Sequence, residues 1–335
     1  MASLFDAKFF NSEVVVEAVG NIKDTTKLEV VASVKRRIDA ELPLRMPEQK
    51  GGNIATVIVH GNLGGDSENY DGSTNITVGS LTNYAQTVVA IGRAHAWGEE
   101  DFQVSIAGYS ELDAQIYQLA IYQDKQVKSA LFSILTGLFA SGGALASKVS
   151  SATSVEPEAL IDLLTAQAGD MSDDFDTVLM DSYVAGELAK AKLLEYAKYT
   201  DREGIERVSN KIGYWGGKMV IIDDMAGTNS GASASVHNVY AYAPYSFRYC
   251  ELPVKVPFEL TREALANGGK DIIVERQRFV LAPEFVSFKP SAMSSLSPTN
   301  TELATAGSWE VVKDGNGNAV DSKIIPFACL RITLQ

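Results

Sequence analysis

Residues 81–141 read LTNYAQTVVAIGRAHAWGEEDFQVSIAGYSELDAQIYQLAIYQDKQVKSALFSILTGLFAS. The apolar, β-branched run at 87–97 predicts a strand, and the acidic residues 99–101 separate it from a helical pattern. We expect one long amphipathic helix that starts near Ser110, which can serve as its N-cap, and runs to Gly137. At 1.5 Å per residue, about 27 residues span roughly 40 Å. The apolar stripe consists of Leu112, Ile116, Leu119, Val127, Ala130, Ile134 and Leu138.

A long two-stranded excursion precedes this stretch. Residues 54–59, IATVIV, predict a strand, the polar and Gly-rich residues 61–73 follow, and the strand pattern resumes at 75–78. The acidic residues at its tip are Asp66, Glu68 and Asp71. An isolated hairpin of this length is not stable in water, so it needs a surface to lie on. No other part of the sequence offers an obvious one.

The rest of the chain mixes helices and strands without a regular βαβ alternation, which favours the α+β class. Residues 1–49 are expected to form an extended arm with some helix. The other helices are expected at residues 156–169 and 182–199. The other strands are expected at 177–182, 211–224, 236–244, 246–263 and 271–288, and as a pair within 308–334.

Composition limits the class of protein. The 335 residues are 46% hydrophobic and 21% charged, which is typical of a globular protein with a buried core. No run of 18 apolar residues is present and the N-terminus lacks an apolar signal core, so we expect no membrane span and no secretion. Cys250 and Cys329 are expected to be buried free thiols, because two cysteines are too few for a disulfide scaffold.

The charge balance is acidic. The net charge of −13 disfavours direct nucleic-acid binding, because an acidic surface repels phosphates. The basic run Lys35, Arg36 and Arg37 is the only such cluster in the sequence, and we expect it to be a solvated face.

The strongest enzyme-like feature is MVIIDD at residues 219–224. An apolar strand that ends in Asp223 and Asp224 is similar to the metal-holding strand of phosphate-binding ATPases, which also need a GxxxxGK loop followed by Ser or Thr. The candidate loop at 212–219 begins with Ile instead of Gly and has Met after the lysine. A soluble metal-dependent hydrolase that uses Asp223 and Asp224 is therefore an alternative beside a buried strand with a polar end.

Other candidate sites are incomplete. Asp170, Ser172 and Asp174 alternate as in a calcium loop, but Phe occupies the position of the turn glycine and the twelfth position is Asp rather than Glu. The histidines, which show no metal-ligand spacing, are His60, His95 and His237. We therefore expect no catalytic, cofactor-binding or metal-ligating residues and no cofactor.

The order and spacing of segments from about residue 50 onward resemble those of tailed-phage major capsid proteins of the Hong Kong 97 type. YAQTVVAIGRAHAWGEEDF at 84–102 resembles the family's return from its extended loop, and residues 103–140 resemble its long helix. The other matching segments are 160–196 and 212–225, which resemble the axial domain, and 236–249, 272–288 and 297–310, which resemble the return into the peripheral domain. The first 49 residues match weakly.

This resemblance implies a Hong Kong 97-like fold. Its parts would be an N-terminal arm at 1–49, an extended loop at 50–97, a peripheral domain at 98–150 and 246–335 that contains the long spine helix, and an axial domain at 151–245. It also implies a surface for the unsupported hairpin, because the family's extended loop lies on the neighbouring subunit.

The same resemblance implies a shell protein rather than an enzyme. Its copies would assemble as pentamers and hexamers into the icosahedral head of a tailed phage, with double-stranded DNA as non-specific contents. The implied partners are scaffolding and portal proteins, with decoration proteins left open, and the implied locations are the host cytoplasm for synthesis and the virion thereafter. An encapsulin-like nanocompartment shell is the alternative with the same fold.

Overall fold

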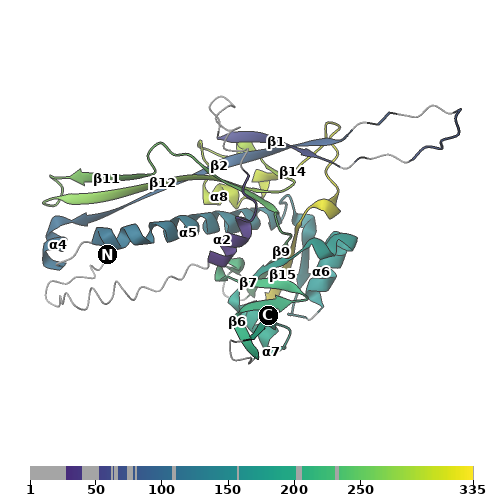
Figure 1. Cartoon of the computed structure of the whole chain (residues 1–335), viewed down its shortest axis with the longest axis horizontal. Helices are drawn as coiled ribbons and strands as arrows, with labels where there is room; N and C mark the ends of the chain where they lie inside the picture. The colour runs from purple at the N-terminus through teal and green to yellow at the C-terminus, as the bar shows by residue number, and fades with distance from the viewer. Residues whose placement is uncertain are drawn as a thin grey trace.

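The computed structural model in Figure 1 describes residues 28–39, 53–61, 63, 67–73, 78–79, 81–107, 111–156, 158–200, 206–230 and 234–334. Two β-sheets lie on either side of one long helix, α5 (Glu111–Phe139). Helices and strands are mixed without regular alternation, so the expected α+β class is confirmed. None of the described helices is long and apolar enough to cross a membrane.

The first sheet is antiparallel throughout, in the order β1-β2-β12-β10, with β11 also paired to β12. Its central strands β2 and β12 are long because each continues outward beyond the core, β2 toward the helix start and β12 alongside it. The strands are β1 (Ile54–His60), β2 (Asn83–Glu100), β10 (Phe247–Leu252), β11 (Phe258–Glu263) and β12 (Lys270–Pro283).

The second sheet is mixed, in the order β3-β15-β9-β4-β7-β6-β5, with β8 paired to β9. Its strands are β3 (Val149–Ala152), β4 (Thr177–Met180), β5 (Glu195–Thr200), β6 (Glu206–Trp215), β7 (Lys218–Ile222), β8 (Gly227–Ser230), β9 (Ala234–Tyr242) and β15 (Phe327–Leu334). The range expected as the peripheral domain thus contributes to both sheets, because β3 and β15 pair within the second one.

Alternation along the strands produces the layers. In the first sheet Ile91 and Phe279 face α5, whereas their neighbours Ala90 and Val280 face a smaller core on the other side. In the second sheet the α5-facing side chains are Leu179, Ile221, Tyr240, Tyr242, Phe327 and Cys329. Its other face packs on α6 (Ala159–Ala168) and α7 (Ser182–Lys190). The order is therefore first sheet, α5, second sheet, then α6 and α7.

The expected long helix is confirmed, and its buried face carries the predicted stripe from Leu119 to Leu138. The side chains of Leu112 and Ile116 and the expected N-cap Ser110 lie outside the described residues. Gly137 is required by close packing, because a Cβ there would lie 2.3 Å from the carbonyl oxygen of Leu303 in α8 (Asn300–Leu303).

Smaller elements complete the chain. They are α2 (Leu28–Val34), α4 (Asp101–Ala107), the pair β13 (Val286–Phe288) and β14 (Trp309–Val311), and the 3₁₀ turns η1 (Ala146–Lys148), η2 (Gly169–Asp174), η3 (Asp224–Ala226), η4 (Pro290–Ala292), η5 (Ala306–Ser308) and η6 (Ser322–Ile324). The short helix α4, at the acidic step between strand and long helix, was not expected from the sequence.

Several expected boundaries were wrong. The helix expected at 182–199 ends at Lys190, because Lys192 adopts a positive φ of 58° and the chain turns into β5. The single strand expected at 211–224 is a hairpin of β6 and β7, turned by Gly216 and Gly217 with φ of 55° and 77°. The strands expected at 246–263 and 271–288 are likewise each divided in two.

Candidate functional site

The two aspartates that follow β7 have separate structural partners. Asp223 Oδ2 lies 2.6 Å from Nζ of Lys128 in α5, and its Oδ1 accepts a hydrogen bond from the N–H of Met225 at 3.0 Å. Asp224 Oδ1 accepts from the N–H of Ser182 at 3.1 Å. Asp223 is only 4% exposed. Because Lys128 and a turn N–H contact its two oxygens, Asp223 is not an open metal site. The Lys128–Asp223 ion pair instead links α5 to the second sheet.

The acids of the calcium-like loop also point to different partners. Asp170 Oδ1 accepts from Nζ of Lys323 at 3.1 Å. Asp181 is the N-cap of α7, where its Oδ1 accepts from the N–H of Val184 at 2.9 Å, and its other oxygen contacts His237. Among the residues that the structure describes, no group of three or more His, Cys, Asp or Glu could hold a metal ion.

The histidines lie in three separate environments. His60 is hydrogen-bonded to Asn83 across the β1–β2 pair, with 2.6 Å between Nδ1 of His60 and Oδ1 of Asn83. His95 packs edge-on against Trp97 at a centroid distance of 4.7 Å. His237 is buried beside Asp181, and the ring of Tyr183 stacks on it. They do not form a shared site.

The cysteines are buried free thiols, as expected. Cys250 lies in β10 of the first sheet and Cys329 in β15 of the second. Burial raises the pKa of each thiol to about 12, so neither is a reactive thiolate at neutral pH.

The basic run is partly exposed, as expected, but each of its three charges is paired within the chain. Lys35 Nζ lies 2.8 Å from Oδ1 of Asp124 in α5, and Arg36 pairs with Asp176, which directly precedes β4. Arg37 Nη1 lies 3.0 Å from Oε2 of Glu284, in the turn between β12 and β13. Three consecutive cations therefore contact three different parts of the fold, and their charges are matched within the chain.

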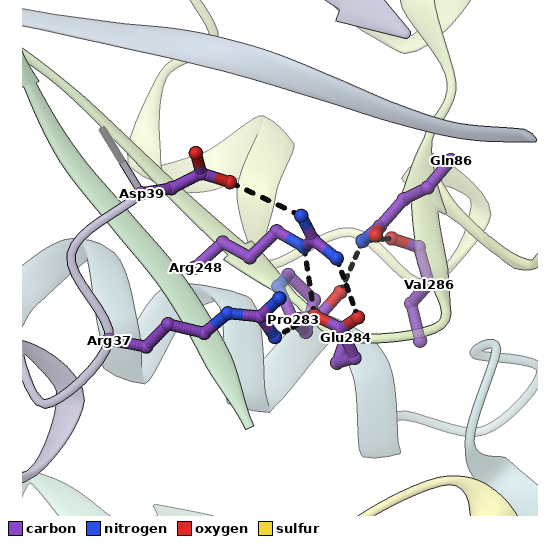
Figure 2. Close-up of polar contacts among 7 residues, drawn as sticks. All are labelled: Arg37, Asp39, Gln86, Arg248, Pro283, Glu284 and Val286. Carbon is purple, nitrogen blue, oxygen red and sulfur yellow. Dashed lines mark hydrogen bonds and ion pairs between the residues drawn. The ribbon is translucent and has the colours of Figure 1, made fainter. Parts of the chain in front are cut away.

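The Arg37 contact belongs to a buried ionic cluster, shown in Figure 2. Arg248 of β10 donates from Nε and Nη2 to the two oxygens of Glu284 at 2.9 and 2.8 Å, a bidentate geometry. Its Nη1 donates to Asp39 Oδ2 at 3.2 Å. Burial lowers the pKa of Arg248, but the bonds to Glu284 and Asp39 outweigh that effect and raise it. Residues 37–39 are thereby fixed against the first sheet.

Backbone contacts reinforce this attachment. Ile38 forms a parallel bridge with Tyr249, and the N–H of Asp39 donates to the carbonyl of Tyr249 at 2.9 Å. On the other side of the turn, the fully buried Gln86 of β2 donates to the carbonyls of Pro283 and Val286 at 2.6 and 3.0 Å (Figure 2). The N-terminal segment and the base of the β1–β2 hairpin therefore meet at one turn.

Both extremities of the molecule expose apolar side chains. In the loop between β1 and β2, Leu63, Tyr70 and Val78 are at least 83% exposed. At the opposite end in Figure 1, every residue of β11 is exposed, and Leu260 and Leu265 are largely in solvent. The tip residue Asp66 lies outside the described residues. The part of the chain that the structure describes leaves these apolar groups uncovered.

Comparison with known proteins gives a consistent result. No family model matches the chain. It is 25% identical to the major capsid protein of Bacillus phage SPP1 over 311 residues, 90% of this chain and 94% of that protein. Its fold is similar to that in the head structure of Helicobacter pylori bacteriophage KHP40, with a TM-score of 0.56 and 9% identity over 85% of each chain. It is also similar to a structure from Microbacterium phage Oxtober96, with a TM-score of 0.53 and 10% identity over 94% of this chain and 93% of that chain. The expected capsid fold is confirmed.

Proposed function

We propose that the chain is a phage major capsid protein, copies of which form the icosahedral head. The observation that carries this proposal is the similarity to the SPP1 major capsid protein along nearly the full length of both chains. The fold agrees with it, because capsid structures at TM-scores above 0.5 share this arrangement over most of their length. The role is structural rather than catalytic, and the location is the virion.

Self-association follows from this role and from the exposed ends of the molecule. The β1–β2 hairpin projects from the sheets, and its apolar side chains have no cover within the described residues. A neighbouring copy would supply that cover, since large exposed apolar groups mark interaction surfaces. Pentamers and hexamers are the closed rings expected of such copies, and scaffolding, portal and decoration proteins are further proposed partners.

The division into an arm at 1–49, an extended loop at 50–97, a peripheral domain and an axial domain is part of the proposal, as is the Hong Kong 97 type. In this proposal the first sheet with α5, including the bases of β1 and β2, forms the peripheral part, and the second sheet with α6 and α7 forms the axial part, with β15 contributed from the range 246–335. Synthesis in the host cytoplasm is also proposed.

Charge agrees with DNA as non-specific contents. The net charge is −13, and Lys35, Arg36 and Arg37 are each paired with a carboxylate of the same chain. A wall of this kind does not adsorb the packaged phosphates.

The two alternatives are weaker. A hydrolase based on Asp223 and Asp224 is disfavoured, because Asp223 is buried against Lys128. An encapsulin-like nanocompartment would share the fold, but the sequence similarity is to a phage protein.

The test is to express the chain alone and with a scaffolding partner, and to examine both samples by gel filtration and negative-stain microscopy. Closed particles are expected. Only small soluble species in both samples, with metal-dependent hydrolysis that is lost in Asp223→Ala, would contradict the proposal.

A further inference from the structure

Two ion pairs hold the second sheet at opposite ends of the neighbouring parallel strands β4 and β7. Asp176, which directly precedes β4, pairs with Arg36. Asp223, which directly follows β7, pairs with Lys128 of α5. The strands are in register from Thr177 opposite Met219 to Met180 opposite Ile222, so the two carboxylates lie beyond opposite ends of a four-residue ladder.

The two contacts are far enough apart to affect the orientation of the second sheet. Asp176 and Asp223 are five positions apart along the strand direction, about 17 Å at 3.3 Å per residue. The apolar core joins the second sheet to α5, and the two ion pairs add polar contacts at both ends of the β4–β7 ladder. A shift of about 1 Å at one contact would tilt the sheet by about 3° over that lever.

The two pairs differ in burial. Lys128 and Asp223 have side chains that are 8% and 3% exposed, and breaking such a pair would leave an uncompensated buried charge. The side chains of Arg36 and Asp176 are 32% and 39% exposed, and ion pairs of that kind are weaker and screened by salt. The buried pair is thus the fixed point and the exposed pair is the adjustable one.

Arg36 itself is held on the opposite side. Its neighbour Lys35 contacts Asp124 of α5, and Arg37 contacts Glu284 at the end of the first sheet. The segment 33–39 therefore spans from the first sheet and α5 to the second sheet. Ser33 adds a further contact to the second sheet, with 2.8 Å between its Oγ and Oη of Tyr242.

We propose that the Arg36–Asp176 pair adjusts the angle between the second sheet and α5 within the range that their shared apolar core allows, with Lys128–Asp223 as the pivot, and so adjusts the angle at which copies meet in the shell. This rests on the proposed shell function. In a closed shell, both the first sheet with α5 and the second sheet would contact neighbouring copies. A change of a few degrees in the angle between them in each copy therefore changes the curvature of the shell and hence the particle diameter.

The test is charge reversal, with particle diameter measured by electron microscopy. Arg36→Glu and Asp176→Arg are each expected to give a shifted or broadened diameter distribution, and the double variant is expected to restore the wild-type distribution. The matched control is Lys323→Glu, which breaks the exposed pair between Lys323 of η6 and Asp170 of η2. This variant is expected to leave the particle diameter unchanged. Wild-type diameters for both single variants, or no restoration in the double variant, would overturn the inference.

A second measurement separates this inference from the shell function. Crystal structures of unassembled subunits are expected to show the second sheet tilted by a few degrees relative to α5 in Arg36→Glu, and in its wild-type orientation in Lys323→Glu. Arg36→Gln serves if the charge reversal does not fold. A wild-type orientation of the second sheet in the Arg36 variants would overturn the angle claim even if shells form. Absence of wild-type particles would instead overturn the shell function.

Discussion

Lys128 and Asp223 form an ion pair between α5 and the end of β7, with 2.6 Å between Nζ and Oδ2, and both residues are at least nine-tenths buried. It lies beside the apolar core that α5 shares with both sheets. The acidic strand end that is similar to a metal site in sequence is therefore a structural contact.

Replacing Lys128 by Met is expected to destabilise the subunit by about 3 kcal/mol, because Asp223 would remain buried without a counter-charge. The double variant Lys128→Met/Asp223→Asn is expected to recover part of the loss, since Asn removes the charge and keeps an oxygen for the turn N–H. Urea unfolding of the unassembled subunit measures both. Lys190→Met, in an exposed pair with Glu187, is the control. Equal effects of the two lysine substitutions would refute a structural role for the buried pair.

Gly137 and Gly186 form a matched pair of helical glycines. In Gly137→Ala, the new Cβ would lie 2.3 Å from a backbone oxygen of Leu303, and we expect a loss of about 1 to 3 kcal/mol. Gly186 of α7 has nothing within 4 Å of the corresponding position, so Gly186→Ala is expected to stabilise by about 0.5 to 1 kcal/mol. Thermal or urea unfolding compares them. A stabilising Gly137→Ala would show that α8 does not pack this closely on α5.

Lys148 makes stability depend on pH. It is 1% exposed, its Nζ donates to the carbonyls of Gln167 and Ile325 at 3.1 and 3.2 Å, and burial lowers its pKa to about 8 from 10.5. Between these values the unfolded chain binds more protons, so stability rises with pH. The free energy of unfolding of wild type relative to Lys148→Met is expected to rise by about 2 kcal/mol from pH 7 to 9.5. If the difference in unfolding free energy between wild type and Lys148→Met were constant over this pH range, the pKa of Lys148 would not be lowered in the folded chain.

Deletion of residues 61–73 is expected to leave the subunit folded and to prevent assembly. The described residues of the loop, 61, 63 and 67–73, contribute no side chain to any of the three cores, so the unfolding midpoint should match wild type. Particle yield, measured by sedimentation, should fall sharply because the loop would no longer cover a neighbour. Wild-type yield from the deletion would argue against that contact.

Long, periodic elements were predictable from the sequence, and boundaries set by tertiary contacts were not. The apolar stripe of α5 and the β-branched run of β2 give local signals, and both elements are present. Residues 191–199 continue a helical pattern, but pairing of β5 with β6 overrides that preference. The Gly216–Gly217 turn did have a signal, since two adjacent glycines favour a two-residue hairpin.

The ion pairs of the basic run could not be predicted for a different reason. Nothing near Lys35, Arg36 and Arg37 in the sequence indicates their partners, which lie 89, 140 and 247 positions away. A basic run is a solvated face unless the fold brings carboxylates to it, and only the assembled tertiary structure shows that it does.

The most direct test of the capsid function is an icosahedral reconstruction, by cryo-electron microscopy, of particles purified from cells that express this chain alone or with the proposed scaffolding partner. We predict closed shells of pentamers and hexamers in which residues 61–82 of one copy lie on the next. A homogeneous monomer under the same conditions, or particles in which residues 61–82 contact only their own chain, would contradict it.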